Sequence, residues 1–327
     1  MLRACVIGLG ASGRAHAAAY RGDERAQLVA VCDGDGQRAS ATAARLRVAA
    51  FSDPAEMLRA VSPDLVSICV EGDPAALVVE GLTAGCHVLC EAPFSQGTAA
   101  TRELLALART RGRVLAADFN LRFTPAAVRA KEWIEAGRLG TPLFINAAVW
   151  LTCDDEPEAA WLIRRLMCHG FDLMRHLCGD IERVQSFAAD ALERPAPSSV
   201  QINVQFASGV VGNLTVSSDM PARHPLARWE VAGTTARVVV DNVYEEVTLY
   251  PHAEDERTVI TNSIFGGLGG YEETYARRIG CLLDQMASDA GLDDIEASAE
   301  DALAAQAVAE AAMGSLETGE IARVTRV

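Results

Sequence analysis

The sequence has no excess of positive charge, and this absence limits the partners that it can bind. Its 327 residues include 29 lysines and arginines against 44 aspartates and glutamates, which gives a formal net charge of −15. Nucleic acids and anionic membranes attract basic surfaces and repel acidic ones. We therefore expect a small-molecule substrate and no nucleic acid or membrane partner.

Long hydrophobic runs and paired cysteine motifs are also missing. No segment reaches the roughly 18 consecutive apolar residues that cross a bilayer, and no export signal is visible. The nine cysteines form no CxxC pair, and their odd number and scattered positions favour a reducing compartment over a disulfide framework. The sequence thus predicts a cytoplasmic protein.

Apolar residues are plentiful, at 50% of the chain, which is enough for two domains with separate cores. Up to residue 120, strand-like runs alternate with helical stretches. This alternation predicts an α/β fold over residues 1–120, with a doubly wound parallel sheet covered by helices as in a Rossmann domain.

Beyond residue 120 the periodicity changes. Val200–Phe206 alternates strictly between apolar and polar residues, Ser208–Gly209 turns the chain, and Val210–Ser217 returns as a second strand. This pattern is typical of a β-hairpin with one buried face. We expect an α+β domain with a mainly antiparallel sheet over residues 121–327, which would contribute to the substrate-binding site.

The start of the chain carries a glycine-rich turn between an apolar run and an alanine-rich helical stretch. In a GxGxxG turn of this kind, Gly8 permits the bend, Gly10 lets the backbone approach a pyrophosphate, and Gly13 allows the helix to pack on the strand. The predicted cofactor-binding residues of the turn are Gly8, Leu9, Gly10, Ala11, Ser12 and Gly13.

A carboxylate follows the second predicted strand, Gln27–Cys32, at Asp33, about twenty residues past the glycines. Here a carboxylate accepts hydrogen bonds from the adenosine ribose of NAD. Arg38 is the only nearby candidate to receive the 2′-phosphate of NADP, so the sequence favours NAD over NADP.

Several motifs together resemble the Gfo/Idh/MocA family of nicotinamide-dependent oxidoreductases over nearly the whole chain. They are Gly8–Gly13 with His16, Leu28–Asp33, Gly85–Pro93, Asn120–Pro125, Gly137–Gly140, His169–Asp172 and Glu300–Gly319. The resemblance implies a homodimer or homotetramer that associates through the second-domain sheet. It also implies further cofactor contacts at Val70, Glu71, Glu91, Ala92 and Asn120.

The chain departs from this family where the family's chemistry takes place. The resemblance expects a lysine in a Glu-Lys-Pro motif, where an ammonium stabilises developing alkoxide charge or relays a proton, but the chain has Ala92. It also expects an aspartate four residues before His169, and Arg165 stands there. Only seven residues separate Trp161 from His169, whereas the resemblance implies a longer, glycine-rich segment that lines the active site. This difference predicts a pocket of altered shape.

His169 is the best candidate for a general acid or base, because imidazole exchanges protons near neutral pH. On a helix, His169, Asp172 and His176 share one face. That face suits a catalytic His/Asp pair, a metal site, or ordinary packing in which Asp172 fixes local structure. We predict catalytic roles for His169, Arg165 and Asp172, and no bound metal.

The arginines near this helix suggest recognition of an anion. Arg165, Arg164 and Arg122 could hold a carboxylate or phosphate through forked hydrogen bonds, or could simply be solvated. Lys131 is a poor substitute for the missing lysine, because it lies among residues typical of a solvated helix face.

Two classes of function remain open. The first is an NAD(H)-dependent oxidoreductase acting on a carbonyl, hydroxyl or imine, with His169 moving the proton. An imine would need less help from a lysine, because it is more easily protonated than a ketone. The second class keeps the dinucleotide site without net redox chemistry, as a lyase, a cyclase or a binding or regulatory subunit, and Ala92 and Arg165 favour it.

Overall fold

The computed structural model describes residues 1–150, 162–189, 197–218, 227–243, 245–262, 270–288, 291 and 294–327. Trp161 lies outside these residues, and with it the start of the shortened segment before His169. The chain forms two compact units. The first contains Met1–Asn120 and Glu272–Leu303, and the second contains Leu121–Tyr271 and Ala304–Val327.

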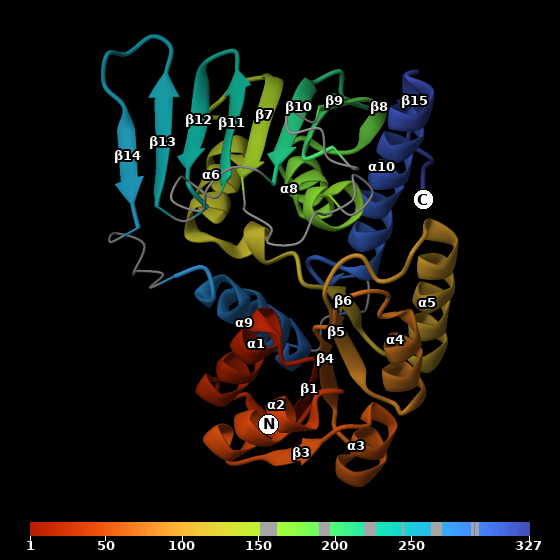
Figure 1. Ribbon diagram of the computed structural model, residues 1–327. Coiled ribbons are helices and arrows are strands. Elements are labelled where there is room, and N and C mark those ends of the chain that lie inside the picture. Colours follow the sequence, from red (N-terminus) through yellow and green to blue (C-terminus); the bar gives the residue numbers. More distant parts are fainter. Residues whose placement is uncertain are drawn as a thin grey trace. The chain divides into compact units, whose positions relative to one another are not determined.

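The first unit contains a six-stranded parallel sheet with strand order β3-β2-β1-β4-β5-β6 (Figure 1). The predicted doubly wound fold is thereby confirmed. The order reverses between β1 and β4, and a doubly wound sheet binds its ligand at the carboxyl edge beside such a reversal. The strands are β1 (Leu2–Ile7), β2 (Ala26–Cys32), β3 (Ala49–Phe51), β4 (Leu65–Ile68), β5 (His87–Cys90) and β6 (Leu115–Ala117).

Helices connect these strands, and local sequence signals define several of their ends. Asp53 caps the third helix by accepting hydrogen bonds from the backbone of Ala55 and Glu56, and Pro54 occupies its first turn, where a missing N–H costs nothing. The connecting helices are α1 (Ala11–Gly22), α2 (Gly36–Leu46), α3 (Pro54–Val61), α4 (Ala75–Thr83) and α5 (Thr98–Arg111).

Helix α9 (Glu273–Ala287) belongs to the first unit. From the sequence we expected all of residues 121–327 to belong to the second domain. Residues Ile279, Leu282 and Leu283 of α9 are buried in the core of the first unit. The buried Arg278 donates from Nε to the carbonyl oxygen of Ala117 at the end of β6, at 2.8 Å. These contacts, rather than chain order, define the unit.

The second unit contains a nine-stranded sheet with strand order β14-β13-β12-β11-β7-β10-β9-β8-β15. Its neighbours pair antiparallel except β7 and β10, so the predicted mainly antiparallel sheet is confirmed. The predicted hairpin is β9 and β10. The strands are β7 (Pro142–Trp150), β8 (Ile181–Ala189), β9 (Ser199–Phe206), β10 (Val211–Ser217), β11 (Ala227–Gly233), β12 (Ala236–Asp241), β13 (Glu246–Pro251), β14 (Thr258–Thr261) and β15 (Ala322–Arg323).

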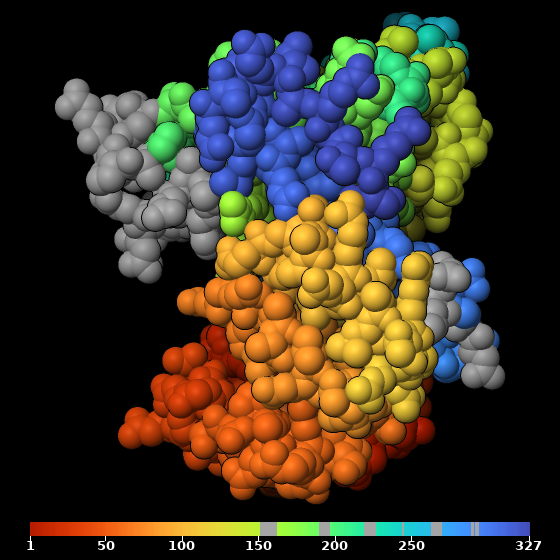
Figure 2. Space-filling view, turned by 90° about the vertical axis from the view of Figure 1, so that its right-hand side faces the viewer, coloured from red at the N-terminus to blue at the C-terminus, as the bar shows by residue number. Residues whose placement is uncertain are grey.

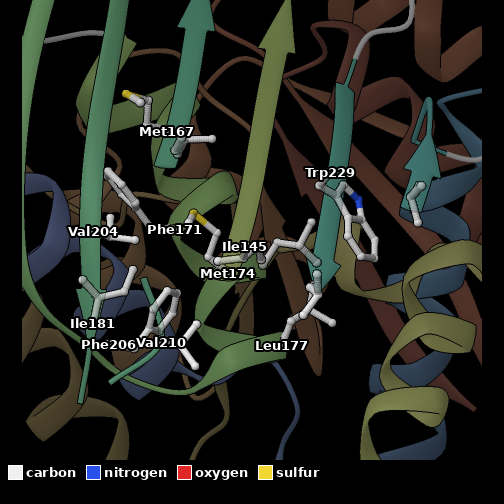
Figure 3. Packing of buried hydrophobic residues seen from close by; sticks show 14 of the residues in the cluster. Ile145, Met167, Phe171, Met174, Leu177, Ile181, Val204, Phe206, Val210 and Trp229 are labelled. Atoms are coloured by element: carbon white, nitrogen blue, oxygen red, sulfur yellow. The ribbon is translucent and has the colours of Figure 1, made fainter. Parts of the chain in front are cut away.

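Helices α6 (Pro125–Glu135) and α8 (Met167–Cys178) pack on one face of this sheet, and a π-helical turn (η2, Leu162–Leu166) leads into α8. Met167, Phe171 and Met174 of α8 extend toward the strands (Figure 3). This packing fixes the orientation of α8.

The last helix, α10 (Ala299–Thr318), begins in the first unit and continues in the second. The C-terminal residues form part of the surface of the second unit, where they appear in blue (Figure 2). No helix within the described ranges combines the length and apolar character needed to cross a lipid bilayer.

The substitution Gly212→Ala tests how closely β7 and β10, the parallel pair of strands in the second unit, approach each other. A Cβ at this position would lie 2.3 Å from the carbonyl oxygen of Ile145 in β7, so we expect Gly212→Ala to reduce the free energy of unfolding by about 1–3 kcal/mol. Urea unfolding measures the change. Gly22→Ala, where a Cβ meets no atom within 4 Å, is the matched control and should remain within about 0.5 kcal/mol of wild type. Equal stability of the two variants would contradict the predicted clash.

Candidate active site

The glycine turn between β1 and α1 has the geometry of a phosphate-binding turn. Gly8 has φ +85°, and a Cβ there would lie 2.3 Å from the carbonyl oxygen of Cys69. A Cβ on Gly13 would lie 1.8 Å from the carbonyl oxygen of Gly8, whereas one on Gly10 would meet nothing within 4 Å. The first and third glycines are required by the protein itself. The second leaves space for a ligand.

The start of α1 is available to that ligand. The helix begins at Ala11, and no side chain caps its first turn, so the amides of Ala11 and Ser12 can bind a phosphate. Arg14 donates from Nη1 to the carbonyl oxygen of Leu9 at 2.9 Å and so holds the turn in shape. Val70 lies close to Gly8, with Cγ1 3.0 Å from where a Cβ would be.

Asp33 follows β2 and is 8% exposed. Its Oδ2 accepts from the backbone N–H of Leu9 at 2.8 Å, and its Oδ1 accepts from that of Asp35 at 2.8 Å. The Arg38 guanidinium, which is 48% exposed, lies 3.4 Å from Oδ2. A carboxylate at this position binds ribose hydroxyls and repels a 2′-phosphate. Arg38, the residue that the sequence analysis considered as a partner for that phosphate, forms an ion pair with Asp33 instead.

The remaining predicted cofactor residues follow β4, β5 and β6. Glu71 is exposed and Glu91 half-buried. Ala92 is 3% exposed, so its methyl group lies within the protein. Asn120 is buried and donates from Nδ2 to Oγ1 of Thr274, in the first turn of α9, at 2.7 Å. These residues all follow the carboxyl ends of parallel strands, and their contact with the cofactor stays a prediction.

A buried polar network lies at the same edge. The His16 imidazole is 0% exposed, with Nδ1 3.0 Å from Oγ of Ser67 and Nε2 2.9 Å from Oδ2 of Asp118. The Tyr20 hydroxyl is 2.7 Å from the same serine oxygen. Burial alone would lower the pKa of His16, but the charge and hydrogen bond of Asp118, together with the charge of Glu91, outweigh it and raise the pKa above its ordinary value.

Three potential metal ligands are close together here, since one ligand atom from each of His16, Cys69 and Glu91 lies within 4.8 Å of the others. Both nitrogens of His16 already have polar partners. Burial raises the pKa of the Cys69 thiol well above its ordinary value, which disfavours the thiolate that metals bind. The geometry therefore suits a hydrogen-bonded network, and the absence of a metal stays a prediction.

In the second unit, α8 carries the catalytic candidates. His169 is half-buried, one turn after Arg165 in the chain. Asp172 is 1% exposed and accepts hydrogen bonds from the buried Arg122, from Nε at 2.6 Å to Oδ2 and from Nη2 to Oδ1. Both carboxylate oxygens of Asp172 thus bind Arg122, which ties the chain around Arg122 to α8 within the second unit. This ion pair fits the packing alternative for Asp172. The catalytic role of Asp172 and the anion-binding role of Arg122 stay predictions.

The other charged side chains near α8 have different partners. Arg164 donates from Nε to the thioether sulfur of Met313 at 2.9 Å, while Arg165 is half-buried in the π-helical turn. Lys131 donates from Nζ to the carbonyl oxygen of His176, in the last turn of α8, at 2.6 Å. The lysine was expected on a solvated face, but its side chain is 28% exposed and stabilises the end of a helix.

A doubly wound sheet with this glycine turn and a carboxylate after β2 defines a dinucleotide-binding protein. Residues 2–119 match the oxidoreductase family with an NAD-binding Rossmann fold, and residues 127–239 match the GFO/IDH/MocA C-terminal domain. The chain belongs to the Gfo/Idh/MocA family of oxidoreductases, and its cofactor is NAD. The predicted family and class of enzyme are confirmed.

Named relatives resemble different lengths of the chain. The D-glucoside 3-dehydrogenase of Escherichia coli is 38% identical over 158 residues, which are 46% of this chain and 44% of that protein. The myo-inositol 2-dehydrogenase of Thermotoga maritima is 25% identical over 97% of this chain and 96% of its own length. An NAD binding oxidoreductase from Klebsiella pneumoniae, known from a crystal structure, is 25% identical, covers 100% of this chain and 99% of its own, and has a TM-score of 0.86.

In the sequence, His16 is recognised only as part of the Gly8–Gly13 motif, and its hydrogen-bond partners are not predicted. The available signal was positional, because Cys69 lies just after β4, Glu91 follows β5 and Asp118 follows β6. Polar side chains that follow neighbouring parallel strands meet at the carboxyl edge of the sheet. His16 and Tyr20 are also one helical turn apart, which places them on the same face of α1.

Gly10→Ala tests the phosphate site without disturbing the fold. Because the added methyl group meets no protein atom within 4 Å, we expect an unchanged melting temperature, while the Kd for NADH rises about tenfold or more, equivalent to about 1.4 kcal/mol. Calorimetric titration gives the Kd, and Gly22→Ala should bind as wild type does. Unchanged affinity in Gly10→Ala would place the pyrophosphate elsewhere.

His16→Gln tests the buried network through the pH dependence of stability. A raised folded pKa stabilises the protein fully below the unfolded value of 6.5, and this contribution is lost as the pH rises through the folded pKa. The stability difference between wild type and His16→Gln should therefore narrow as the pH rises above the unfolded value of 6.5 and through the raised folded pKa. Urea unfolding at a series of pH values measures it.

His87→Gln is the control for that series. Burial, with the charge of Arg113, lowers the pKa of His87, so wild type should gain stability relative to this variant as the pH rises. Parallel pH curves for the two variants would argue against a raised pKa at His16.

Proposed function

We propose that this protein is an NAD⁺-dependent dehydrogenase that oxidises a secondary hydroxyl group of a sugar or cyclitol. The observation that carries the proposal is the intact glycine turn, in which Gly10 is the glycine with open space and Asp33 accepts a hydrogen bond from the backbone N–H of Leu9. The relatives support this substrate class, because they are dehydrogenases of a glucoside and an inositol.

Removing hydrogen from a secondary alcohol takes a hydride from carbon and a proton from oxygen. Bound NAD⁺ supplies the hydride acceptor. The chain must provide the proton acceptor, and Ala92 cannot do so. We assign this role to His169, which can bind a proton at neutral pH and which α8 holds in place through the Arg122–Asp172 ion pair.

NAD is preferred over NADP in this proposal. Asp33 places a carboxylate where the 2′-phosphate of NADP would lie, and Arg38 is close to that carboxylate. Arg165, half-buried one turn before His169, is proposed to bind an oxygen substituent of the substrate through its forked donors.

We also propose a cytoplasmic homodimer or homotetramer. The face of the second-unit sheet opposite α8 carries exposed apolar residues, with Phe187 54% and Val211 51% exposed. Their cross-strand partners Gln201 and Gln205 lie on β9 between them. Apolar side chains on such a face favour contact with a second copy.

The test combines binding with turnover. We expect NADH to bind the purified protein more tightly than NADPH by at least about tenfold, and NADH absorbance to increase when NAD⁺ is mixed with a panel of cyclitols, glycosides and anhydrosugars. His169→Asn should lower kcat by about 10²- to 10⁴-fold. His176→Asn, another half-buried histidine of α8, should retain activity.

The non-redox alternative makes a different prediction. Ala92 and Arg165 favour it, because the chain lacks the ammonium and the carboxylate expected at these positions. Tight NADH binding together with a product of elimination or ring closure, and no change in NADH absorbance, would establish a lyase or cyclase. Failure of both nucleotides to bind would contradict the dehydrogenase and leave a binding or regulatory subunit.

A further inference from the structure

The buried network around His16 has no role in the function proposed above. His16 and Asp118 are each 0% exposed, a costly position for an ionisable pair. Oδ1 of Asp118 is buried and has no hydrogen-bond partner within the described part of the chain. A carboxylate with one oxygen unmatched leaves negative potential at this point.

Topology places this network on a particular half of the cofactor site. A dinucleotide crosses the carboxyl edge at the strand-order reversal between β1 and β4. Asp33, which follows β2, marks the adenosine side. The nicotinamide therefore belongs on the side of β4, β5 and β6, the strands that Cys69, Glu91 and Asp118 follow.

The charged groups around His16 come close to balance when its imidazole is protonated. Negative charge comes from Asp118 after β6 and Glu91 after β5, and Arg278 of α9 contributes a permanent positive charge. The other neighbours are the Cys69 thiol, whose pKa burial raises, the Tyr20 hydroxyl and the ring of Tyr275, 5.3 Å from the imidazole. Among these groups, His16 is the one whose protonation can change the net charge of the network near neutral pH.

We propose that His16, held by Asp118, is a proton site whose occupancy follows the charge of the cofactor. It holds a proton when the site is empty or contains NADH, whose nicotinamide ring is uncharged, and it releases that proton when the cationic ring of NAD⁺ binds. Without the proton, Asp118 and Glu91 outnumber Arg278 by one charge, which the nicotinamide cation then matches.

This role rests on the proposed NAD⁺ chemistry and completes its proton balance. Alcohol oxidation yields a ketone, NADH and one proton. With the reduced, uncharged ring bound, the imidazole of His16 would hold one proton taken from solvent, while His169 would return the proton of the alcohol to solvent. His16 contacts no reacting atom in this scheme, so it is a positioning residue that adjusts local charge.

The test is a calorimetric titration of the full chain with NAD⁺ and with NADH from about pH 6 to about pH 9, in buffers of different ionisation enthalpy. NAD⁺ binding should release up to about one proton and should tighten with pH by at most about tenfold per unit. NADH binding should release none, and its Kd should stay flat.

His16→Gln and Asp118→Asn should both abolish the proton release and flatten the NAD⁺ profile. The second variant keeps a hydrogen-bond acceptor for His16 while removing the charge, so it serves if the first fails to fold. His87→Gln is the matched control, because His87 lies at the start of β5, whereas Glu91 of the network follows the other end of that strand. This variant should retain the wild-type pH profile of NAD⁺ binding.

Two results would overturn the inference while leaving the dehydrogenase intact. One is an identical pH dependence for NAD⁺ and NADH. The other is a proton release that persists in His16→Gln or Asp118→Asn. If neither nucleotide bound the wild-type protein, the proposed function and the proton site would both fail.

Discussion

The close approach of α1 to the carbonyl oxygen of Gly8 is the constraint on which the first unit depends. Only a residue without a Cβ fits at Gly13, because that atom would lie 1.8 Å from the oxygen. The same approach brings the amides of the first turn to the carboxyl edge of the sheet and lets His16 and Tyr20 reach Ser67 in β4. One backbone contact therefore builds both the phosphate site and the buried network beneath it.

The sequence predicted the features that depend on local residues. The glycine turn, the carboxylate after β2 and the β9–β10 hairpin follow from spacing and alternation over short segments. The placement of α9 did not follow, because an amphipathic helix can cover either core. Its buried Arg278 donates a hydrogen bond to the carbonyl oxygen of Ala117, which is 161 residues away in the chain.

The candidate site shows the same limit. Helical periodicity placed His169 and Asp172 on one face of α8, but it gave no information on Arg122, the partner that occupies the carboxylate from 50 residues away. The pairing of His16 with Asp118 spans 102 residues. Side chains distant in sequence meet only after the sheet has brought strand ends together, so their chemistry becomes visible in the tertiary structure.

Alanine at position 92 is consistent with a site in which charge follows the cofactor. A lysine there would place a permanent cation beside Glu91, where it would compete with the nicotinamide ring for negative charge. Ala92 leaves His16 and Arg278 as the cations that act on this network, and of these only the imidazole can lose its proton near neutral pH. Without the ammonium the substrate side has one proton donor fewer, but no added lysine charge offsets the negative charge of Asp118 and Glu91 that would balance NAD⁺.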